Sequence, residues 1–301
     1  MVVRTLPALL LLFGLACSTP DPERRAVAFL AREVPGWPVK NRCFSCHNNG
    51  DAARALFEAR RRSLPFDPRA LDSTERWLSR PEDWKEAGPP GEFSDKKLAA
   101  LQFAFALSTS DEAGPALARA AARVRDLQEA DGSWAVDAAG LPGSPVTYGR
   151  TLATVASRSV LAQAGSHFAG ALARADQWLR RQRPVTVLDA GALLLGPADE
   201  VQRVTCLELL RKGEFKEGGW GPYVTSAPEV FDTAVVLLGL AEFPDEAGVA
   251  EMRRHGRKFL VETQQPDGSW PETTRPSGGE SYAQRISTTG WATLALLTTP
   301  R

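Results

Sequence analysis

A short stretch near the carboxyl end of the chain, FLVETQQPDGSW at positions 259–270, constrains the fold more than any other. Its aromatic–aliphatic pair and its glutamine fall at helical spacing, and Pro266 ends the helix. Asp267-Gly268 is a strong turn dipeptide, and Trp270 follows closely enough to pack back on the helix. The stretch therefore predicts the end of a helix, a tight glycine turn and a buried tryptophan.

Weaker copies of this stretch recur along the whole sequence. Gly132-Ser133-Trp134 and Gly218-Gly219-Trp220 repeat the tail, and Trp178-Leu179 repeats the head. The heads of the copies stand at positions 29, 77, 123, 178, 209 and 259. Their mean spacing of about 46 residues suits one helical hairpin per repeat. The sequence therefore predicts six similar hairpins.

Each repeat continues into a second segment that is apolar on nearly all sides, for example residues 98–107 and 291–297. Helices of that kind are buried on both flanks, whereas the first helices, such as residues 246–263, are amphipathic. An open array of hairpins needs polar ends, but the terminal segments around Phe29 and Trp291 are as apolar as the rest. We therefore expect an all-α, closed ring with an inner and an outer layer of helices.

The repeat resembles the QW repeat of squalene-hopene and oxidosqualene cyclases, in which an aromatic–aliphatic pair, three residues and a glutamine precede Gly-x-Trp. The stretch 259–270 matches closely, while Arg123 replaces the aromatic residue in the copy that ends at Trp134. The resemblance implies the α/α toroid (barrel) of terpenoid cyclases and of protein prenyltransferase β subunits. It implies about six helical hairpins, in a single domain over residues 17–301.

The first residues of the chain have the pattern of an export signal. Arg4 precedes an apolar run, residues 6–15, that is too short to span a membrane as an ordinary helix. We expect a signal peptide over residues 1–16. Cys17 resembles the lipid-attachment site of bacterial lipoproteins and would become the mature N-terminus; cleavage without lipidation is the alternative. The expected location is the periplasm of a bacterium, or its membrane as an anchored lipoprotein.

The composition narrows the choice of partners. With 36 basic and 36 acidic residues the formal net charge is zero, which gives no reason to propose nucleic acid or an anionic membrane as a partner. The membrane is then reached only through the N-terminal lipid anchor. We consider a redox partner or a small apolar ligand as the binding partner. The sequence does not indicate an oligomeric state.

Functional residues of a toroid are expected where the loops enter the inner helices. Aspartates stand at four of these entrances, and we assign Asp95 and Asp189 to helix capping. Glu229-Val-Phe231-Asp232-Thr-Ala resembles the Asp-x-Asp-Asp-Thr-Ala motif of class II terpenoid cyclases, whose middle aspartate protonates an alkene. Such an acid needs a pKa raised by burial and like charge. The resemblance makes Glu229 and Asp232 weak candidates for the acid, but Phe231 occupies the donor position.

Two further observations argue against the enzymes that share these repeats. Squalene-type cyclases use two toroidal domains, whereas this chain has one. The zinc of protein prenyltransferases is held by Asp, Cys and His, and Cys206 lies in a predicted outer helix, where we interpret it as a small buried hydrophobe. The chain is therefore predicted not to be a cyclase, and whether it is an enzyme stays open.

The most specific chemical signature is Cys43-Phe44-Ser45-Cys46-His47, in the first hairpin loop. Cys-x-x-Cys-His attaches c-type haem, because the two thiols bond the haem while the adjacent histidine reaches the iron. Export to a compartment where such attachment occurs agrees with this interpretation. Two alternatives stay open: a disulfide between Cys43 and Cys46, and zinc, for which no fourth ligand is apparent.

The chain also resembles exported bacterial proteins that join Cys-x-x-Cys-His to prenyltransferase-like repeats. Met252 and His255 are weak candidates for the sixth iron ligand, because the sixth hairpin adjoins the first in a closed ring; a five-coordinate or water-ligated iron is equally allowed. The leading hypothesis is a toroid with covalent haem c at its cavity mouth, for electron transfer or ligand binding. The alternatives are an isoprenoid-acting enzyme with Glu229 or Asp232 as acid, and a haem-free interaction scaffold.

Overall fold

The computed structural model describes residues 21–86, 96–111, 113–136, 142–273, 275, 279 and 281–299. The expected signal peptide, Cys17 and Asp95 lie outside these residues. The described residues form α-helices and short helices of other types, and they contain no strand. The outer helices are α1 (Pro22–Asn41), α3 (Asp72–Leu78), α5 (Gly114–Asp126), α7 (Ala169–Arg181), α9 (Glu200–Gly213) and α11 (Val249–Thr263). The inner helices are α2 (Ala53–Arg61), α4 (Lys96–Thr109), α6 (Gly149–Gln163), α8 (Val187–Leu194), α10 (Val230–Ala241) and α12 (Tyr282–Thr298).

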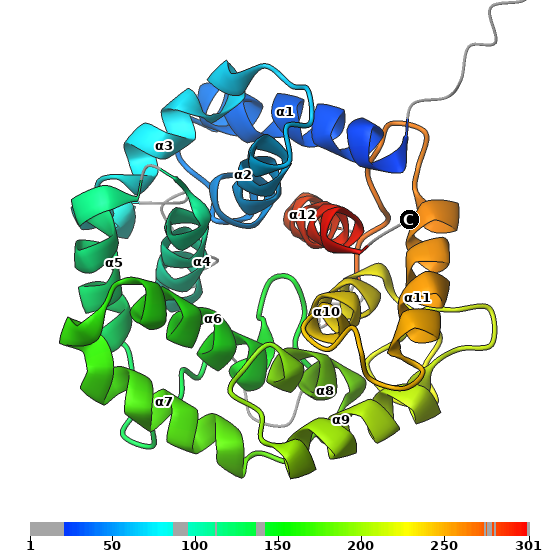
Figure 1. The fold of residues 1–301 in the computed structure, drawn as a ribbon. Coiled ribbons are helices and arrows are strands. Elements are labelled where there is room, and N and C mark those ends of the chain that lie inside the picture. The colour runs from blue at the N-terminus through cyan, green and yellow to red at the C-terminus, as the bar shows by residue number, and fades with distance from the viewer. Residues whose placement is uncertain are drawn as a thin grey trace, which may run out of the picture.

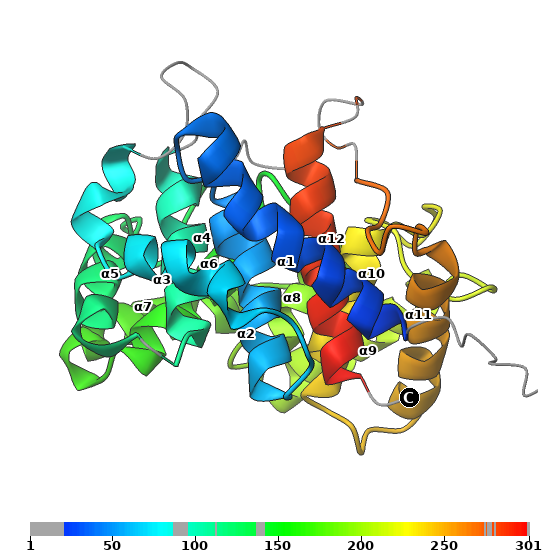
Figure 2. The same cartoon turned by 90° about the horizontal axis from the view of Figure 1, so that it is seen from above.

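These helices form two concentric rings, as Figure 1 shows. Outer and inner helices alternate along the chain, so that each pair is one hairpin. The last inner helix, α12, packs against α1 and α2 of the first hairpin, and the view from above shows α1 crossing in front of α12 (Figure 2). The predicted α/α toroid of six hairpins is therefore confirmed, with all six repeat heads in the outer helices.

The tryptophan turns of the repeat have the same geometry in three hairpins. Each indole Nε1 donates to a carbonyl of the preceding outer helix: Trp134 to Val124 at 2.7 Å, Trp220 to Leu210 at 2.8 Å and Trp270 to Leu260 at 2.7 Å. Each backbone N–H of these tryptophans donates to a threonine of the following inner helix, Thr154, Thr233 or Thr289. Buried aromatic rings with a satisfied polar group contribute much to a core, so the repeat encodes the hairpin directly.

The same turn closes the ring between the last hairpin and the first. Gly268 has φ 95°, and a Cβ there would lie 2.3 Å from the Arg25 carbonyl oxygen of α1, so only glycine fits. Gln264 Nε2 donates to the carbonyl oxygens of Gly268 at 3.0 Å and Pro22 at 2.9 Å. Arg257 of α11 forms a buried ion pair with Glu23 of α1. Hydrogen bonds and an ion pair between the last hairpin and α1 therefore close the ring, together with apolar packing.

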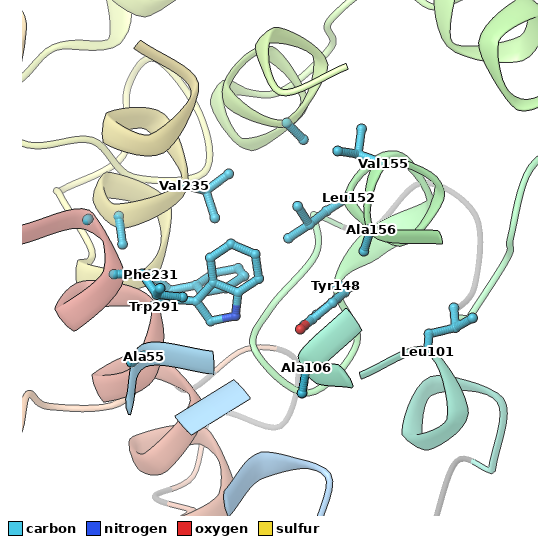
Figure 3. Close-up of a cluster of buried hydrophobic side chains, with 14 of the residues drawn as sticks. Ala55, Leu101, Ala106, Tyr148, Leu152, Val155, Ala156, Phe231, Val235 and Trp291 are labelled. Carbon is cyan, nitrogen blue, oxygen red and sulfur yellow. The ribbon is translucent and has the colours of Figure 1, made fainter. Parts of the chain in front are cut away.

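Buried apolar side chains from several inner helices point toward one another inside the toroid, among them Phe231, Val235 and Trp291 (Figure 3). Trp291 of α12 is 1% exposed and packs edge-on against Phe231 and Tyr148, with ring centroids 5.7 and 5.6 Å away. Phe103 of α4 instead packs against Trp77 of α3 and against Trp84 of the short helix Pro81–Glu86. None of the described helices is long and apolar enough to cross a membrane.

The last inner helix is longer than its apolar segment. The sequence marks residues 291–297 as apolar, but α12 begins at Tyr282, so Ser287 and Thr289 also lie inside the helix. In the structure they hydrogen-bond His47 and the Trp270 backbone, which is why polar residues occupy a buried helical segment.

Candidate functional site

The Cys-x-x-Cys-His segment leads into a short π-helix, His47–Ala52, that precedes α2. Asn49 donates to the Val34 carbonyl oxygen at 3.2 Å and to Thr74 Oγ1 at 2.9 Å. Asn48 donates to Tyr282 Oη at 3.0 Å. These bonds fix the segment to α1, α3 and α12 at once. π-Helical turns are rare and frequently occur at functional sites.

The two cysteines of the segment are half-buried at the entrance to the first inner helix. No disulfide joins Cys43 to Cys46 in the structure. Phe44, between them, stacks on Trp77 of α3 with ring centroids 4.5 Å apart. Within the described ranges no group of three His, Cys, Asp or Glu side chains is placed to hold a metal ion. Among the described residues, Cys43, Cys46 and His47 are therefore close in sequence but not placed as a group of three metal ligands.

His47 is held in one orientation by the last hairpin. Its Nδ1 lies 2.9 Å from Ser287 Oγ of α12, and its Nε2 has no hydrogen-bond partner among the residues that the structure describes. Burial lowers the pKa of His47 to about 4, so the imidazole is neutral at neutral pH. In the tautomer whose Nδ1–H donates to Ser287 Oγ, the neutral imidazole presents the Nε2 lone pair, the arrangement that histidine uses as a metal ligand.

Met252 and His255 of α11 face the fifth hairpin. Both line a pocket of about 430 Å³ together with Arg211 and Glu214 of the α9 region. His255 Nδ1 lies 2.7 Å from Glu214 Oε1, and Met252 is buried. His47 has its contact with α12 instead. The structure therefore does not bring either candidate for the sixth iron ligand together with His47.

A second group of polar residues, which sequence reasoning did not assign to a site, surrounds Asp51 at the end of the same π-helix. Asp51 is fully buried; one carboxylate oxygen accepts the Tyr148 hydroxyl, and the other accepts Gln102 Nε2 at 2.8 Å. Arg54 Nη1 lies 3.7 Å from Asp51. Burial raises the pKa of Asp51 to about 6, although the positive charge of Arg54 opposes the shift. Titratable groups shifted in this way by desolvation are candidates for function.

Tyr148 reaches Asp51 from a strained backbone. Its φ is 61°, a value that residues with a side chain rarely adopt, and the following Gly149 has φ 73°. Such conformations persist only where the surroundings determine them, and they cluster at functional sites. Burial and the Asp51 charge raise the pKa of Tyr148 well above its ordinary value, so the hydroxyl stays a donor.

Asp232 of α10 forms a different site. Arg275, in the loop before α12, donates to both Asp232 oxygens at 2.9 and 3.1 Å and to the Gly143 carbonyl oxygen at 2.9 Å. It also lies 2.6 Å from Glu229 Oε2. Burial raises the pKa of Asp232 to about 7, with Arg275 opposing the shift and Glu229 adding to it. The two sequence-predicted acids therefore share one arginine.

The remaining predicted residues have structural roles. Asp189 forms a capping box with Thr186 at the start of α8, with hydrogen bonds of 2.9 and 3.1 Å in the two directions, so the capping assignment is confirmed. Cys206 is fully buried in α9, and burial raises its pKa to about 12. It is an inert apolar side chain of an outer helix, as the sequence predicted.

Comparisons with known proteins place the fold among terpene cyclases. No protein-family model matches the sequence, and no curated protein is significantly similar to it. Among solved structures, the apo form of the type II terpene cyclase MstE from Scytonema covers 92% of this chain at 17% identity, with a TM-score of 0.56, and 98% of its own chain is covered. A variant of MstE in complex with geranylgeranyl dihydroxybenzoate (substrate) has 16% identity and a TM-score of 0.54. Another, with merosterolic acid A (product), has 20% identity and a TM-score of 0.54.

This likeness concerns the fold, and it corrects one argument from the sequence. Because this chain covers nearly all of MstE, a type II terpene cyclase can consist of one toroid of this size. The number of toroids distinguishes this chain from squalene-type cyclases but not from MstE. Phe231 at the donor position remains the sequence feature that separates this chain from the motif.

Proposed function

We propose that this chain is an exported toroid that carries covalent c-type haem on Cys43, Cys46 and His47, for electron transfer or for binding a small ligand. The observation that carries the proposal is the orientation of His47. Its Nδ1 is occupied by Ser287 and its Nε2 is not used by the described protein. A histidine adjacent to two half-buried cysteines of a Cys-x-x-Cys-His segment then has the nitrogen it needs for iron.

The surroundings of the segment agree with this function. Because Asn48 and Asn49 fasten the π-helix to three neighbouring helices, both thiols are presented from a rigid loop, which favours attachment at defined positions. When bound, a c-type haem supplies one-electron redox chemistry or an open iron coordination position. Because Met252 and His255 face the fifth hairpin, we propose a five-coordinate or water-ligated iron. The export signal and the lipid anchor at Cys17 are part of this proposal.

The test is covalent attachment in a host with a haem-attachment system. We expect the mature protein to give a c-type pyridine haemochrome spectrum, and the double variant Cys43→Ala/Cys46→Ala to lose it. Cys206→Ala is the matched control and should keep the haem, since that thiol lies buried in α9. His47→Ala should keep covalent haem but change the spectrum of the iron. A mature wild-type protein without covalent haem would contradict the proposal and favour a haem-free interaction scaffold.

A second candidate is an enzyme acting on an isoprenoid, with Asp232 as its acid. One observation favours it: burial raises the pKa of Asp232 to about 7, and the adjacent Phe231 packs on Trp291 in the toroid centre. A carboxylic acid near its pKa beside apolar walls is suited to protonating an alkene. The fold neighbour with geranylgeranyl dihydroxybenzoate indicates the class of substrate to try.

This second candidate is tested with geranylgeranyl aryl acids and linear isoprenoids, followed by mass spectrometry of the products. Turnover that Asp232→Asn abolishes while leaving the circular dichroism spectrum intact would support Asp232 as the acid. Asp189→Asn is the matched control, because Asp189 caps α8 and accepts a hydrogen bond from Thr151, and neither contact involves Asp232. Turnover unchanged in Asp232→Asn would exclude Asp232 from the reaction.

A further inference from the structure

The guanidinium of Arg54 is buried in the toroid, and two of its three nitrogens have no acceptor among the described residues. Arg54 is 5% exposed, and its Nε and Nη1 atoms have no hydrogen-bond partner within the part of the chain that the structure describes. The nearest carboxylate oxygen, on Asp51, is 3.7 Å from Nη1, which is beyond hydrogen-bonding distance. The group is therefore charged, desolvated and able to donate.

Aromatic rings hold this guanidinium in place. The Arg54 Cζ atom lies 3.7 Å from the centroid of the Phe105 ring and 4.5 Å from that of Trp291. Contacts of this kind stabilise the cation through the ring quadrupoles. They use the face of the rings and not the hydrogen-bonding capacity of the N–H groups. The Arg54 guanidinium is therefore held in position in the ligand-free protein.

A second polar atom beside Arg54 is also without a partner. Gln102 is fully buried, and its Nε2 donates to Asp51 at 2.8 Å, but its Oε1 accepts no hydrogen bond from the described residues. Leaving a buried polar group unsatisfied is costly, and it costs more for a charged group. Native proteins rarely retain several such atoms in one place unless a bound molecule satisfies them.

We propose that Arg54 anchors an oxyanion in the centre of the toroid, namely the carboxylate or phosphate group of a small organic molecule. Arginine in a desolvated site is matched best by an oxyanion, because charge-assisted hydrogen bonds are the strongest available to it. Gln102 Oε1 then accepts a hydroxyl of the same molecule. Phe105 is only partly buried and flanks the guanidinium, so an apolar body of the ligand lies along its ring. This site does not involve Cys43, Cys46 or His47 and does not depend on haem.

The experiment is isothermal titration calorimetry on the full mature chain with three probes. Benzoate supplies a carboxylate with an apolar body, inorganic phosphate supplies the other oxyanion, and benzyl alcohol is the neutral match for benzoate. We expect at least one anion to bind and benzyl alcohol not to bind, and the anion that binds distinguishes a carboxylate ligand from a phosphate ligand. Arg54→Met should weaken that binding by about tenfold or more. Arg24→Met, at an exposed site on α1, should leave it unchanged.

Further variants keep the proposal open to refutation. If Arg54→Met does not fold, Trp291→Phe keeps an aromatic ring in the core and should weaken anion binding several-fold, because the smaller ring stacks less well. The Cys43→Ala/Cys46→Ala chain should bind the anion as the wild type does, so a failure of the haem proposal leaves this result unaffected. Absence of binding by both anions at about 10 mM, or equal binding by folded Arg54→Met, would overturn the proposal.

Discussion

Two arginines lie beside buried aspartates in this toroid, and the protein uses them in opposite ways. Arg275 donates to both oxygens of Asp232 and to the Gly143 carbonyl, and it pairs with Glu229. Arg54 approaches Asp51 only to 3.7 Å, and two of its nitrogens lack acceptors. Arg275 therefore hydrogen-bonds protein groups through Nη2 and has the Glu229 carboxylate 2.6 Å from Nη1, whereas among the described residues the Arg54 guanidinium has its carboxylate partner only at 3.7 Å.

We interpret Arg275 as part of a structural ion pair and Arg54 as a ligand-binding group. Arg275 connects the loop before α12 to the loop before α6 and to α10, so it fastens three hairpins at the mouth of the ring. Arg54 is positioned by ring stacking, which fixes it without using its hydrogens. A buried charge in close contact with opposite charges contributes to the stability of the fold, whereas one held farther from them can bind a ligand of opposite charge. Four predictions test whether this distinction holds.

The largest effect is expected from removing Arg275. Arg275→Met leaves Asp232 buried without its partner, and loss of one member of a buried ion pair costs about 3–5 kcal/mol of the free energy of unfolding. Arg54→Met should change that free energy by less than about 1 kcal/mol, because the lost attraction to Asp51 is offset by no longer burying an unsatisfied guanidinium. Urea unfolding of both variants near neutral pH measures the difference. Equal losses would show that Arg54 is also a structural residue.

The pH dependence of stability should differ between the two aspartates. Burial raises the pKa of Asp51 to about 6 and of Asp232 to about 7, from 3.8. Because each folded-state pKa is higher than the unfolded one, the stabilising contribution is present at low pH and is lost as pH rises to about 6 for Asp51 and about 7 for Asp232. Relative to Asp51→Asn, the wild type should lose about 3 kcal/mol between about pH 4 and pH 7.

The free energy of unfolding of the wild type relative to Asp232→Asn should keep falling to about pH 7, which is about one pH unit higher than for Asp51. Comparing each variant with the wild type at every pH removes the opposite contribution of His47, whose pKa burial lowers to about 4. Urea unfolding in a series of buffers gives both curves. If the free energy of unfolding of the wild type relative to the Asn variant rose with pH, these carboxyl groups would be stabilised as anions. That result would contradict the expectation from burial.

A smaller effect is expected from the hydroxyl that binds Asp51. Tyr148→Phe removes a buried hydrogen bond to a carboxylate and should cost about 2 kcal/mol of unfolding free energy at neutral pH. It should also raise the pKa of Asp51 further, because that hydrogen bond favours the charged form. Tyr223→Phe, on an exposed tyrosine, is the control. An unchanged stability would mean that Tyr148 keeps its unusual backbone for packing alone.

The features that the sequence predicted are those whose contacting residues lie close together along the chain. The toroid was predictable because each hairpin carries its own signal: a helical head, a glycine turn and a tryptophan whose partners lie ten residues before it, such as Trp270 and Leu260. Cys43, Cys46 and His47 are adjacent in sequence and were found for the same reason. Local patterns are the part of a fold that sequence reasoning reads best.

The Asp51 group could not be predicted in this way. Asp51 and Arg54 are three residues apart, but Gln102, Tyr148 and Trp291 come from three other hairpins. An aspartate at a helix entrance is adequately explained by capping, and only the packing shows that Asp51 is desolvated. Arg275 lies in an aperiodic loop, so nothing in the sequence pairs it with Asp232.

The smallest effect should come from Glu229, the half-exposed partner of Arg275. Although Glu229 Oε2 lies 2.6 Å from Arg275, its side chain is 32% exposed, and ion pairs that reach solvent contribute about 1 kcal/mol or less and weaken with salt. Glu229→Gln should therefore cost far less than Arg275→Met. It should also lower the pKa of Asp232, because the Glu229 charge helps to raise it. An NMR titration of the Asp232 carboxyl measures this directly. If Glu229→Gln destabilised the protein as much as Arg275→Met, the stabilising effect of Arg275 would come mainly from its pair with Glu229. Asp232 would then remain available as an acid.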